Sequence, residues 1–205
     1  MRRVPLKQLW PSLLIVGGVA LLIYVVSQYA TMYAAQRHLT EQWQQQNLPL
    51  PAQPAGMVTT LTRLTIPNIK LDAVVVEGVN RKDLLMGPGH MPDTPEPGQD
   101  GNAVISAHRD TFFRHIHELK PGDYILVQRA GRQFRYEVTG KKIVKPDDVS
   151  VIKPTQDAEL TLLTCYPTYY IGPAPERLVV FSKLVGVVRS EQPQTPAEPV
   201  AEAAQ

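Results

Sequence analysis

The sequence predicts an all-β domain, folded as a closed barrel or a sandwich, that follows one membrane-spanning helix. Two observations predict the domain. About eight short apolar or alternating segments follow one another between turns, and helical periodicity is scarce among them. A third observation predicts the helix, because the run from Leu13 to Val26 is almost unbroken apolar sequence.

The composition suits one globular domain with attached segments. The chain has 205 residues, 43% hydrophobic and 20% charged, and its net charge is +2. This near-neutral balance does not favour a nucleic acid or a strongly acidic substrate, so we expect no nucleic-acid partner. The single cysteine, Cys165, cannot form a disulfide within the chain. In an exported domain such a cysteine is an inter-chain link, an inert buried thiol or a reactive thiol.

The N-terminal segment predicts a single-pass anchor at residues 9–33, with residues 1–8 in the cytoplasm. No charged residue and no histidine occurs from Gln8 to Gln36, and a membrane-spanning helix needs about 20 residues of this kind. The positive-inside rule places everything after the span outside the cytoplasm, because basic residues precede it at Arg2, Arg3 and Lys7. A cleaved signal peptide is the alternative, but the apolar run is long for one and the following residues make a poor cleavage site.

The rest of the chain divides by composition into three parts. Residues 34–56 form a polar stalk that prolongs the helix, followed by a proline-rich spacer without core potential. Residues 57–188 hold the predicted strands and form the globular domain. Residues 189–205 are rich in Pro, Ala, Glu and Gln, which predicts a disordered tail.

Turn residues separate the predicted strands. Gly and Pro dominate residues 87–101, which predicts a long loop, and short helical turns are expected at 83–85 and 147–152. The strands are predicted from the alternating and apolar runs at 61–66, 69–76, 102–107, 124–127, 133–138, 142–145, 160–165 and 178–181.

Three residues at the edges of apolar strands are candidates for chemistry: Cys165, His108 and Arg177. A thiolate is a nucleophile, and a neighbouring imidazole or guanidinium favours its charged form. An arginine can also stabilise an oxyanion, because its donors are fixed and always charged. The spacing alone does not bring these residues together, and each has a purely structural alternative: a small buried hydrophobe for the cysteine, a hydrogen-bonded turn residue for the histidine and a surface cation for the arginine.

Further residues are candidates for the lining of a substrate groove. Ser106 and Thr164 carry hydroxyl groups next to the histidine and the cysteine, and they are candidate oxyanion donors together with nearby backbone amides. Tyr166 and His90 are the other candidate groove residues. We expect no cofactor and no metal, because only His115 and His117 have close ligand spacing, and they lack carboxylate or cysteine ligands nearby.

Two motifs resemble the sortase family. Thr161-Leu162-Leu163-Thr164-Cys165 fits the sortase TLxTC signature, and Arg177 follows at the start of the next strand. The segment Ala107-His108-Arg109-Asp110-Thr111-Phe112-Phe113-Arg114 looks like the sortase histidine segment, with alanine where relatives commonly have glycine before the histidine. HRDTFFR, TCYPxYYxGPAPxR and the preceding GPGHMP are most similar to class D sortases, and the resemblance runs from about Leu61 to Leu184.

The resemblance implies a membrane-anchored cysteine transpeptidase on an eight-stranded β-barrel. Cys165 would attack the threonine carbonyl of an LPxTG-like sorting signal in an exported protein and form a thioacyl-enzyme. An amine of a cell-wall precursor or another protein would then resolve it. His108 would be the general acid and base, and Arg177 would hold the substrate and stabilise the oxyanion. The alternatives are a thiol peptidase that transfers only to water, a cysteine L,D-transpeptidase, and a non-catalytic envelope domain with an inert Cys165.

Overall fold

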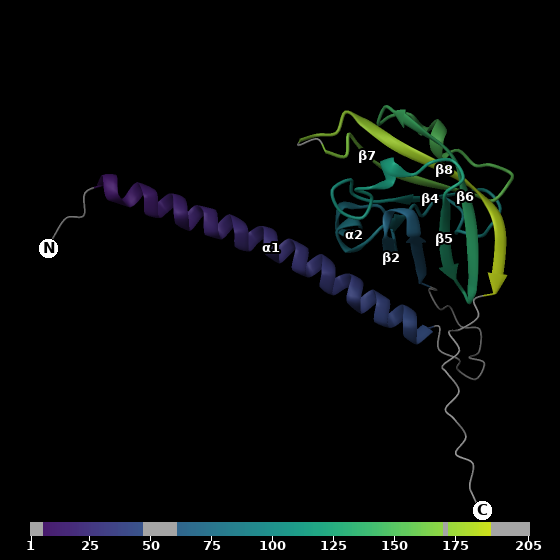
Figure 1. The fold of residues 1–205 in the computed structure, drawn as a ribbon, viewed down its shortest axis with the longest axis horizontal. Helices are drawn as coiled ribbons and strands as arrows, with labels where there is room; N and C mark the ends of the chain where they lie inside the picture. The colour runs from purple at the N-terminus through teal and green to yellow at the C-terminus, as the bar shows by residue number, and fades with distance from the viewer. Residues whose placement is uncertain (1–5, 47–60, 170–171, 190–205) are drawn as a thin grey trace, which may run out of the picture.

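The strands of the protein close into one barrel, as predicted, and a long N-terminal helix runs out from it (Figure 1). The computed structural model describes residues 6–46, 61–169 and 172–189. The barrel order is β1-β2-β3-β4-β7-β8-β6-β5, closed by the pairing of β1 with β5. Most neighbours are antiparallel, but β2 pairs with β3 and β4 pairs with β7 in parallel. The barrel alternative is therefore confirmed over the sandwich.

The elements follow the predicted segments closely, with three main differences. The strand predicted at 178–181 is part of the much longer β8, which reaches residue 189, the first residue of the predicted tail. The segments 133–138 and 142–145 form one long strand, β6, with register shifts before and after Val138, and a two-residue strand, β3, lies in the predicted 87–101 loop. The elements are α1 (Leu6–Gln46), β1 (Thr62–Ile66), η1 (Pro67–Ile69), β2 (Leu71–Glu77), α2 (Arg81–Met86), β3 (Gly89–His90), β4 (Asn102–Ser106), η2 (Ile116–Glu118), β5 (Tyr124–Arg129), β6 (Arg132–Val144), η3 (Val149–Ile152), β7 (Glu159–Tyr166) and β8 (Glu176–Arg189).

A two-residue turn, Ala130-Gly131, joins β5 to β6. Ala130 and Gly131 both have positive φ angles, of 51° and 68°. A two-residue hairpin turn of this hand matches the twist of the strands that it joins.

The barrel interior is a single apolar core. Every strand except the two-residue β3 contributes alternate residues to it, since successive side chains of a strand point to opposite faces. On β7 these are Leu160 and Leu162, and on β8 they are Leu178 and Val180. Both pairs are almost completely buried, which identifies the inward face of the two strands.

A second apolar cluster lies on the outside of the barrel. It contains Val144, Val151 and Val179, with Leu163 packed against it. Leu163 and Val179 alternate with the core residues of β7 and β8, so the cluster marks the outward face. The segment around η3 covers this face, because Asn102 donates hydrogen bonds from its amide to the carbonyls of Val151 and Lys153 at 3.3 and 3.2 Å.

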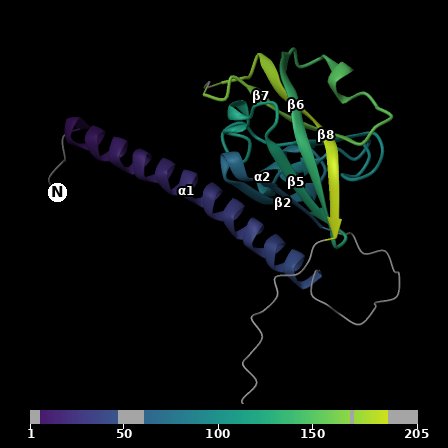
Figure 2. The ribbon, with the colours of Figure 1, turned by 45° about the vertical axis from the view of Figure 1, so that its right-hand side comes forward.

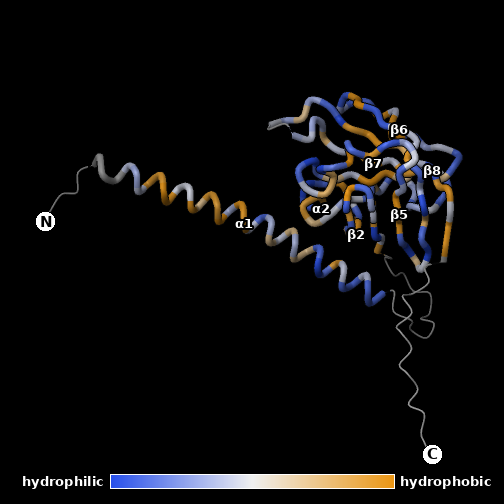
Figure 3. The backbone as a smooth tube through the Cα atoms, viewed as in Figure 1, coloured by the Kyte–Doolittle hydropathy of each residue, from blue (hydrophilic) through white to orange (hydrophobic). Residues whose placement is uncertain are grey.

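Helix α1 is continuous from Leu6 to Gln46 and so includes both the predicted span and the predicted stalk. Its part from Trp10 on is long and apolar enough to cross a membrane, with a mean hydropathy of 2.0 in its most apolar window. Figure 3 shows the apolar half of the helix apart from the barrel and the polar end beside it. The end of the stalk packs against the barrel and does not stand free. The proline-rich spacer at 47–56, the predicted domain start at 57 and the tail beyond 189 lie outside the described residues.

Candidate active site

Cys165 and Arg177 face each other across two antiparallel strands. The register of β7 and β8 pairs them directly, one residue before the pair Tyr166 and Glu176. Residues in such a pair lie on the same face, with Cβ atoms about 4.5–5.5 Å apart. Alternation with the core residues places both side chains on the outward face, and both are only partly buried. The pairing therefore sets the backbone of Arg177 directly opposite that of Cys165, a free and partly buried cysteine.

His108 belongs to the neighbouring edge of the same site. β4 pairs in parallel with β7 up to Ser106 and Leu163, and the Ala107 amide continues this pattern by donating to the Leu163 carbonyl at 3.2 Å. The Thr164 hydroxyl donates to the Ala107 carbonyl at 2.7 Å, across 57 positions of the chain. The following residue, His108, is thus carried alongside Cys165.

The histidine segment then turns back on itself. The Phe113 amide donates to the His108 carbonyl at 3.1 Å, and the Phe113 side chain is fully buried in the barrel core. Ala107 is also buried in that core, 3% exposed, so there is little room for a larger residue before the histidine. The loop that carries His108 is therefore anchored on both sides.

The candidate groove residues divide between the two faces of the sheet. Ser106 is partly exposed and alternates with the inward Ile105 and Ala107, which places it on the outward face near the histidine. Thr164 is only 2% exposed, and its hydroxyl holds the Ala107 carbonyl. Tyr166 is partly buried and packs against the barrel core. Its ring lines a different space from the Cys165 side chain.

That space is an open cavity of about 410 Å³ at the end of the barrel, next to the β7–β8 loop. The lining residues are His117, Lys141, Lys142, Ile143, Tyr166, Thr168, Tyr169 and Leu178.

Arg177 is oriented by the start of its own strand. Its Nη1 donates to the carbonyls of Glu176 and Ala174, at 2.9 and 3.3 Å. These bonds tie the guanidinium to the end of the β7–β8 loop. Both contacts use one guanidinium nitrogen, whereas a lysine has a single nitrogen for the loop carbonyls and for a substrate.

Arg109 is a residue that the sequence reasoning missed. Its Nη1 donates to the Pro167 carbonyl at 3.1 Å, and its Nη2 donates to the Gly172 carbonyl. These two carbonyls belong to opposite sides of the β7–β8 loop, so Arg109 fastens that loop to the histidine segment. Its only signal in the sequence is its place directly after His108.

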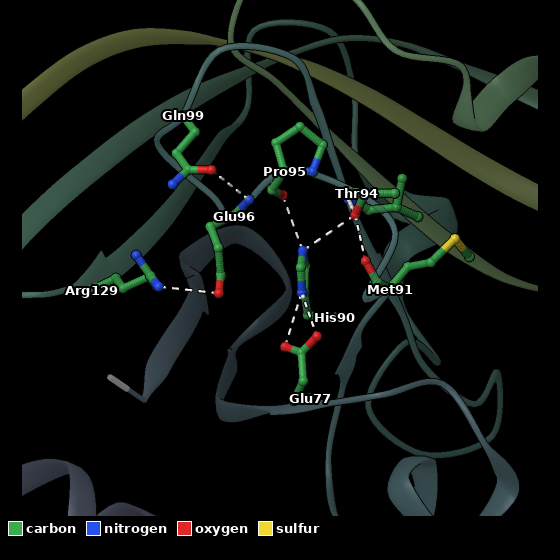
Figure 4. Close-up of polar contacts among 9 residues, drawn as sticks. Glu77, His90, Met91, Thr94, Pro95, Glu96, Gln99 and Arg129 are labelled. Atoms are coloured by element: carbon green, nitrogen blue, oxygen red, sulfur yellow. Dashed lines mark hydrogen bonds and ion pairs between the residues drawn. The ribbon is translucent and has the colours of Figure 1, made fainter. Parts of the chain in front are cut away.

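His90 lies in a polar cluster on the other side of β4 from the cysteine strand (Figure 4). The ring is 4% exposed. Its Nε2 lies 3.0 Å from the Pro95 carbonyl, and its Nδ1 lies 3.0 Å from a carboxylate oxygen of Glu77. Glu96 completes the cluster and pairs with Arg129 at 3.1 Å. Because both ring nitrogens have partners in this cluster, we assign His90 to the support of the 91–101 loop.

The ligand atoms of Glu77, His90 and Glu96 lie within 4.8 Å of one another, close enough in principle to hold a metal ion. Arg129 already supplies a positive charge to Glu96 at this place. The expectation that the protein uses no metal remains a prediction.

His115 and His117 lie on the surface. Their rings stack at 6.4 Å between centroids, and His115 contacts Glu118 at 2.7 Å. Replacing both by alanine is expected to leave the rate of peptide cleavage within about twofold of the unchanged protein, as for exposed positions away from the reacting groups. The check is the kcat/KM of the double variant with a fluorogenic peptide. A large loss would mean that the cavity beside His117 takes part in substrate binding.

Comparison with known proteins agrees with this geometry. The family model described as the sortase domain matches residues 64–185. Sortase D of Bacillus subtilis (strain 168) is 42% identical over 123 residues, which are 60% of this chain and 62% of that protein. Sortase A of Bacillus anthracis is 30% identical over 128 residues, or 60% of this chain and 59% of the relative. The match thus spans about three fifths of the length of these curated relatives.

Solved structures give the same fold. The Clostridium perfringens sortase D5 transpeptidase superposes with a TM-score of 0.64 at 23% identity, covering 75% of this chain and 99% of that one. Sortase A of Listeria monocytogenes gives a TM-score of 0.58 at 27% identity, covering 63% and 90%. The match of the family model to more than half of the chain, together with the fold, shows that the protein belongs to the sortase family.

Proposed function

We propose that the protein is a membrane-anchored cysteine transpeptidase that cleaves an LPxTG-like sorting signal of exported proteins and transfers it to an amine. The observation that carries the proposal is the direct pairing of Cys165 with Arg177, next to the loop of His108. A thiol, an imidazole and a guanidinium at the ends of three adjacent strands are the groups that acyl transfer through a thioester needs.

In the acylation step, the Cys165 thiolate attacks the carbonyl carbon of the signal's threonine. A C–S bond forms, and the carbonyl oxygen takes the negative charge, which the Arg177 guanidinium stabilises. The bond between the threonine carbonyl and the next nitrogen then breaks. His108, as imidazolium, gives its proton to the departing amine, because an amide nitrogen leaves as a neutral amine only when protonated.

The second step reverses these roles. An acceptor amine attacks the thioacyl carbonyl, and the now neutral His108 removes the proton from its nitrogen. The C–S bond breaks and the thiolate of Cys165 is restored. The new amide joins the exported protein to the acceptor, which is a cell-wall precursor or another protein.

The anchor supports a place for this reaction outside the cytoplasm. The apolar part of α1 is a single candidate span near the N-terminus, and basic residues precede it in the sequence. The positive-inside rule puts the N-terminus in the cytoplasm and the barrel on the outer side of the cell membrane. Exported proteins and lipid-linked precursors meet the barrel there.

The test is product analysis with an LPETG peptide, with and without an amine acceptor. The proposal expects a transfer product whose yield rises with the amine. Release of the hydrolysed peptide alone, at every amine concentration, would identify a thiol peptidase. No cleavage and no thiol adduct would identify a non-catalytic domain.

Replacing Arg177 by lysine is expected to lower kcat by about 10²–10³-fold, the usual cost of losing an oxyanion donor. The charge survives, but a lysine has only one nitrogen to serve both the loop carbonyls and the oxyanion. Steady-state kinetics check this, and the fall should lie mainly in kcat. Near-normal activity of the lysine variant would contradict the oxyanion role.

A further inference from the structure

The end of helix α1 is bonded to the edge of the barrel through one side chain. The Val74 amide donates to Oε1 of Gln36 at 3.0 Å, and Nε2 of Gln36 donates to the Val74 carbonyl at 3.1 Å and to the Met86 carbonyl at 2.7 Å. The reason is a gap in the sheet. β3 pairs only with Val76 and Glu77 of β2, so the carboxamide of Gln36 replaces the missing strand at Val74.

Contacts further along α1 extend this docking. The Arg63 guanidinium lies over the Trp43 ring at 4.8 Å from its centroid and forms a bidentate pair with Asp72, at 2.7 and 2.6 Å. That hydrogen bonding lowers the pKa of Asp72 below its ordinary value. Oε1 of Gln46 accepts from the Leu61 amide at 3.2 Å. From Gln36 to Gln46 the helix is held to the barrel over about 15 Å of its length.

The order of these contacts gives the direction of the barrel relative to the span. Gln36, nearer the span, meets Val74, while Gln46, farther from it, meets the residue before β1. β1 therefore runs from its distant start at Thr62 toward the span.

The directions of the other strands relative to the span follow from their parallel or antiparallel pairing. β2 and β5 are antiparallel to β1, and β6 is antiparallel to β5, so β6 runs toward the span. β8 is antiparallel to β6 and begins at the near end, with Arg177 at its second position. β7 runs toward the span and carries Cys165 at its end, and β4, parallel to β7, leads in the same direction to His108.

The views agree with the registers. Figures 1 and 2 both show the β7–β8 loop reaching toward the side of the N-terminal half of α1. Tyr169 on this loop is 84% exposed, and tyrosine is a residue that favours the interface between membrane and water. Phe112 of the histidine segment and Tyr33 of α1 line one cavity of about 410 Å³.

We propose that the docked end of α1 holds the catalytic end of the barrel toward the membrane, with Gln36 as the positioning residue. The docking then favours cleavage of a bond that lies within a few residues of the bilayer. This inference rests on the proposed transpeptidase function and on the anchor. The docked helix selects substrates by the distance of their scissile bond from the bilayer, a distance that a soluble peptide does not have.

The experiment uses the full chain in lipid vesicles with substrates that carry LPETG, a Gly-Ser spacer and a membrane-spanning helix. Spacers of roughly 5, 20 and 40 residues are compared, since the local concentration of a tethered group falls as about the −3/2 power of linker length. The unchanged protein should cleave the shortest-spacer substrate fastest, with a fall of at least about tenfold to the longest.

Gln36→Ala should lose this preference and cleave the shortest-spacer substrate about tenfold more slowly, while its kcat/KM for a soluble LPETG peptide stays unchanged. Gln45→Ala, an exposed glutamine on the same helix, is the matched control and should behave like the unchanged protein. Hydrogen exchange at the Val74 amide should become faster in Gln36→Ala only, which distinguishes undocking from loss of the fold.

Equal rates for all three spacers in the unchanged protein would overturn the inference. The inference would also be overturned if Gln36→Ala kept the same spacer preference although hydrogen exchange showed its Val74 amide to be exposed. If the unchanged protein cleaves no soluble peptide at all, the proposed function fails instead, and the two failures are thereby distinguished.

Discussion

Replacing Cys165 by alanine is expected to abolish turnover of an LPETG peptide, with a fall in kcat/KM of at least about 10⁴-fold. In the proposed mechanism the thiolate is the atom that attacks, and alanine leaves no group at this position to form the acyl intermediate. The fold should survive, because Cys165 is only partly buried and stands at the strand end, outside the barrel core. Circular dichroism and the melting temperature check this.

A covalent probe makes the same prediction in a second way. A sorting-signal peptide with a thiol-reactive group in place of the scissile bond should add one probe mass to the protein. Cys165 is the only cysteine of the chain, so any thiol adduct reports this residue. Turnover that persists in Cys165→Ala, or the absence of an adduct in an active preparation, would contradict the nucleophile assignment.

Replacing His108 by alanine is expected to abolish detectable transfer, with a loss of about 10²–10⁴-fold from general acid–base catalysis. The size of the loss should depend on the leaving group of the substrate. A substrate with a good leaving group, such as an activated ester of the same peptide, needs no protonation on departure. The His108→Ala variant should therefore acylate far better with the ester than with the amide, whereas the unchanged protein accepts both.

The deacylation step supplies the control for His108. Hydroxylamine is nucleophilic without a general base, and it should release the thioacyl enzyme of the variant faster than an ordinary amine does. Equal losses with the amide and the ester would contradict the general-acid role. They would instead assign His108 to the formation of the thiolate, since both substrates need it.

The local features of this chain could be predicted because they depend on neighbours in sequence. Alternation at 61–66 and the apolar run at 160–165 give strands at nearly these places, and Asp148 caps the short turn by accepting a hydrogen bond from the Ser150 amide. The two-residue β3 was not predicted. A strand of this length has no periodicity, and it exists only because its neighbours β2 and β4 leave backbone groups for it.

The candidate site could be predicted only in part, for a similar reason. The motifs around Cys165 and His108 predict the reacting groups that we propose. Whether the side chains of Thr164 and Tyr166 face the groove depends on the alternation of β7 relative to a closed barrel, and the sequence does not show which face is inward. Thr164 bonds to the histidine segment, which the sequence could not indicate.

By itself, the sequence predicted every strand but β3, the apolar span and the three proposed chemical groups, because each depends on a few consecutive residues. Only the tertiary structure decided that the His108 loop lies beside Cys165 and that Arg177 faces it, through the parallel pairing of β4 with β7 and the register of β8. The hydrogen bond from the Val74 amide to Gln36 is likewise visible only in the tertiary structure. Such contacts join residues far apart in the chain, and their register follows from closing the whole barrel.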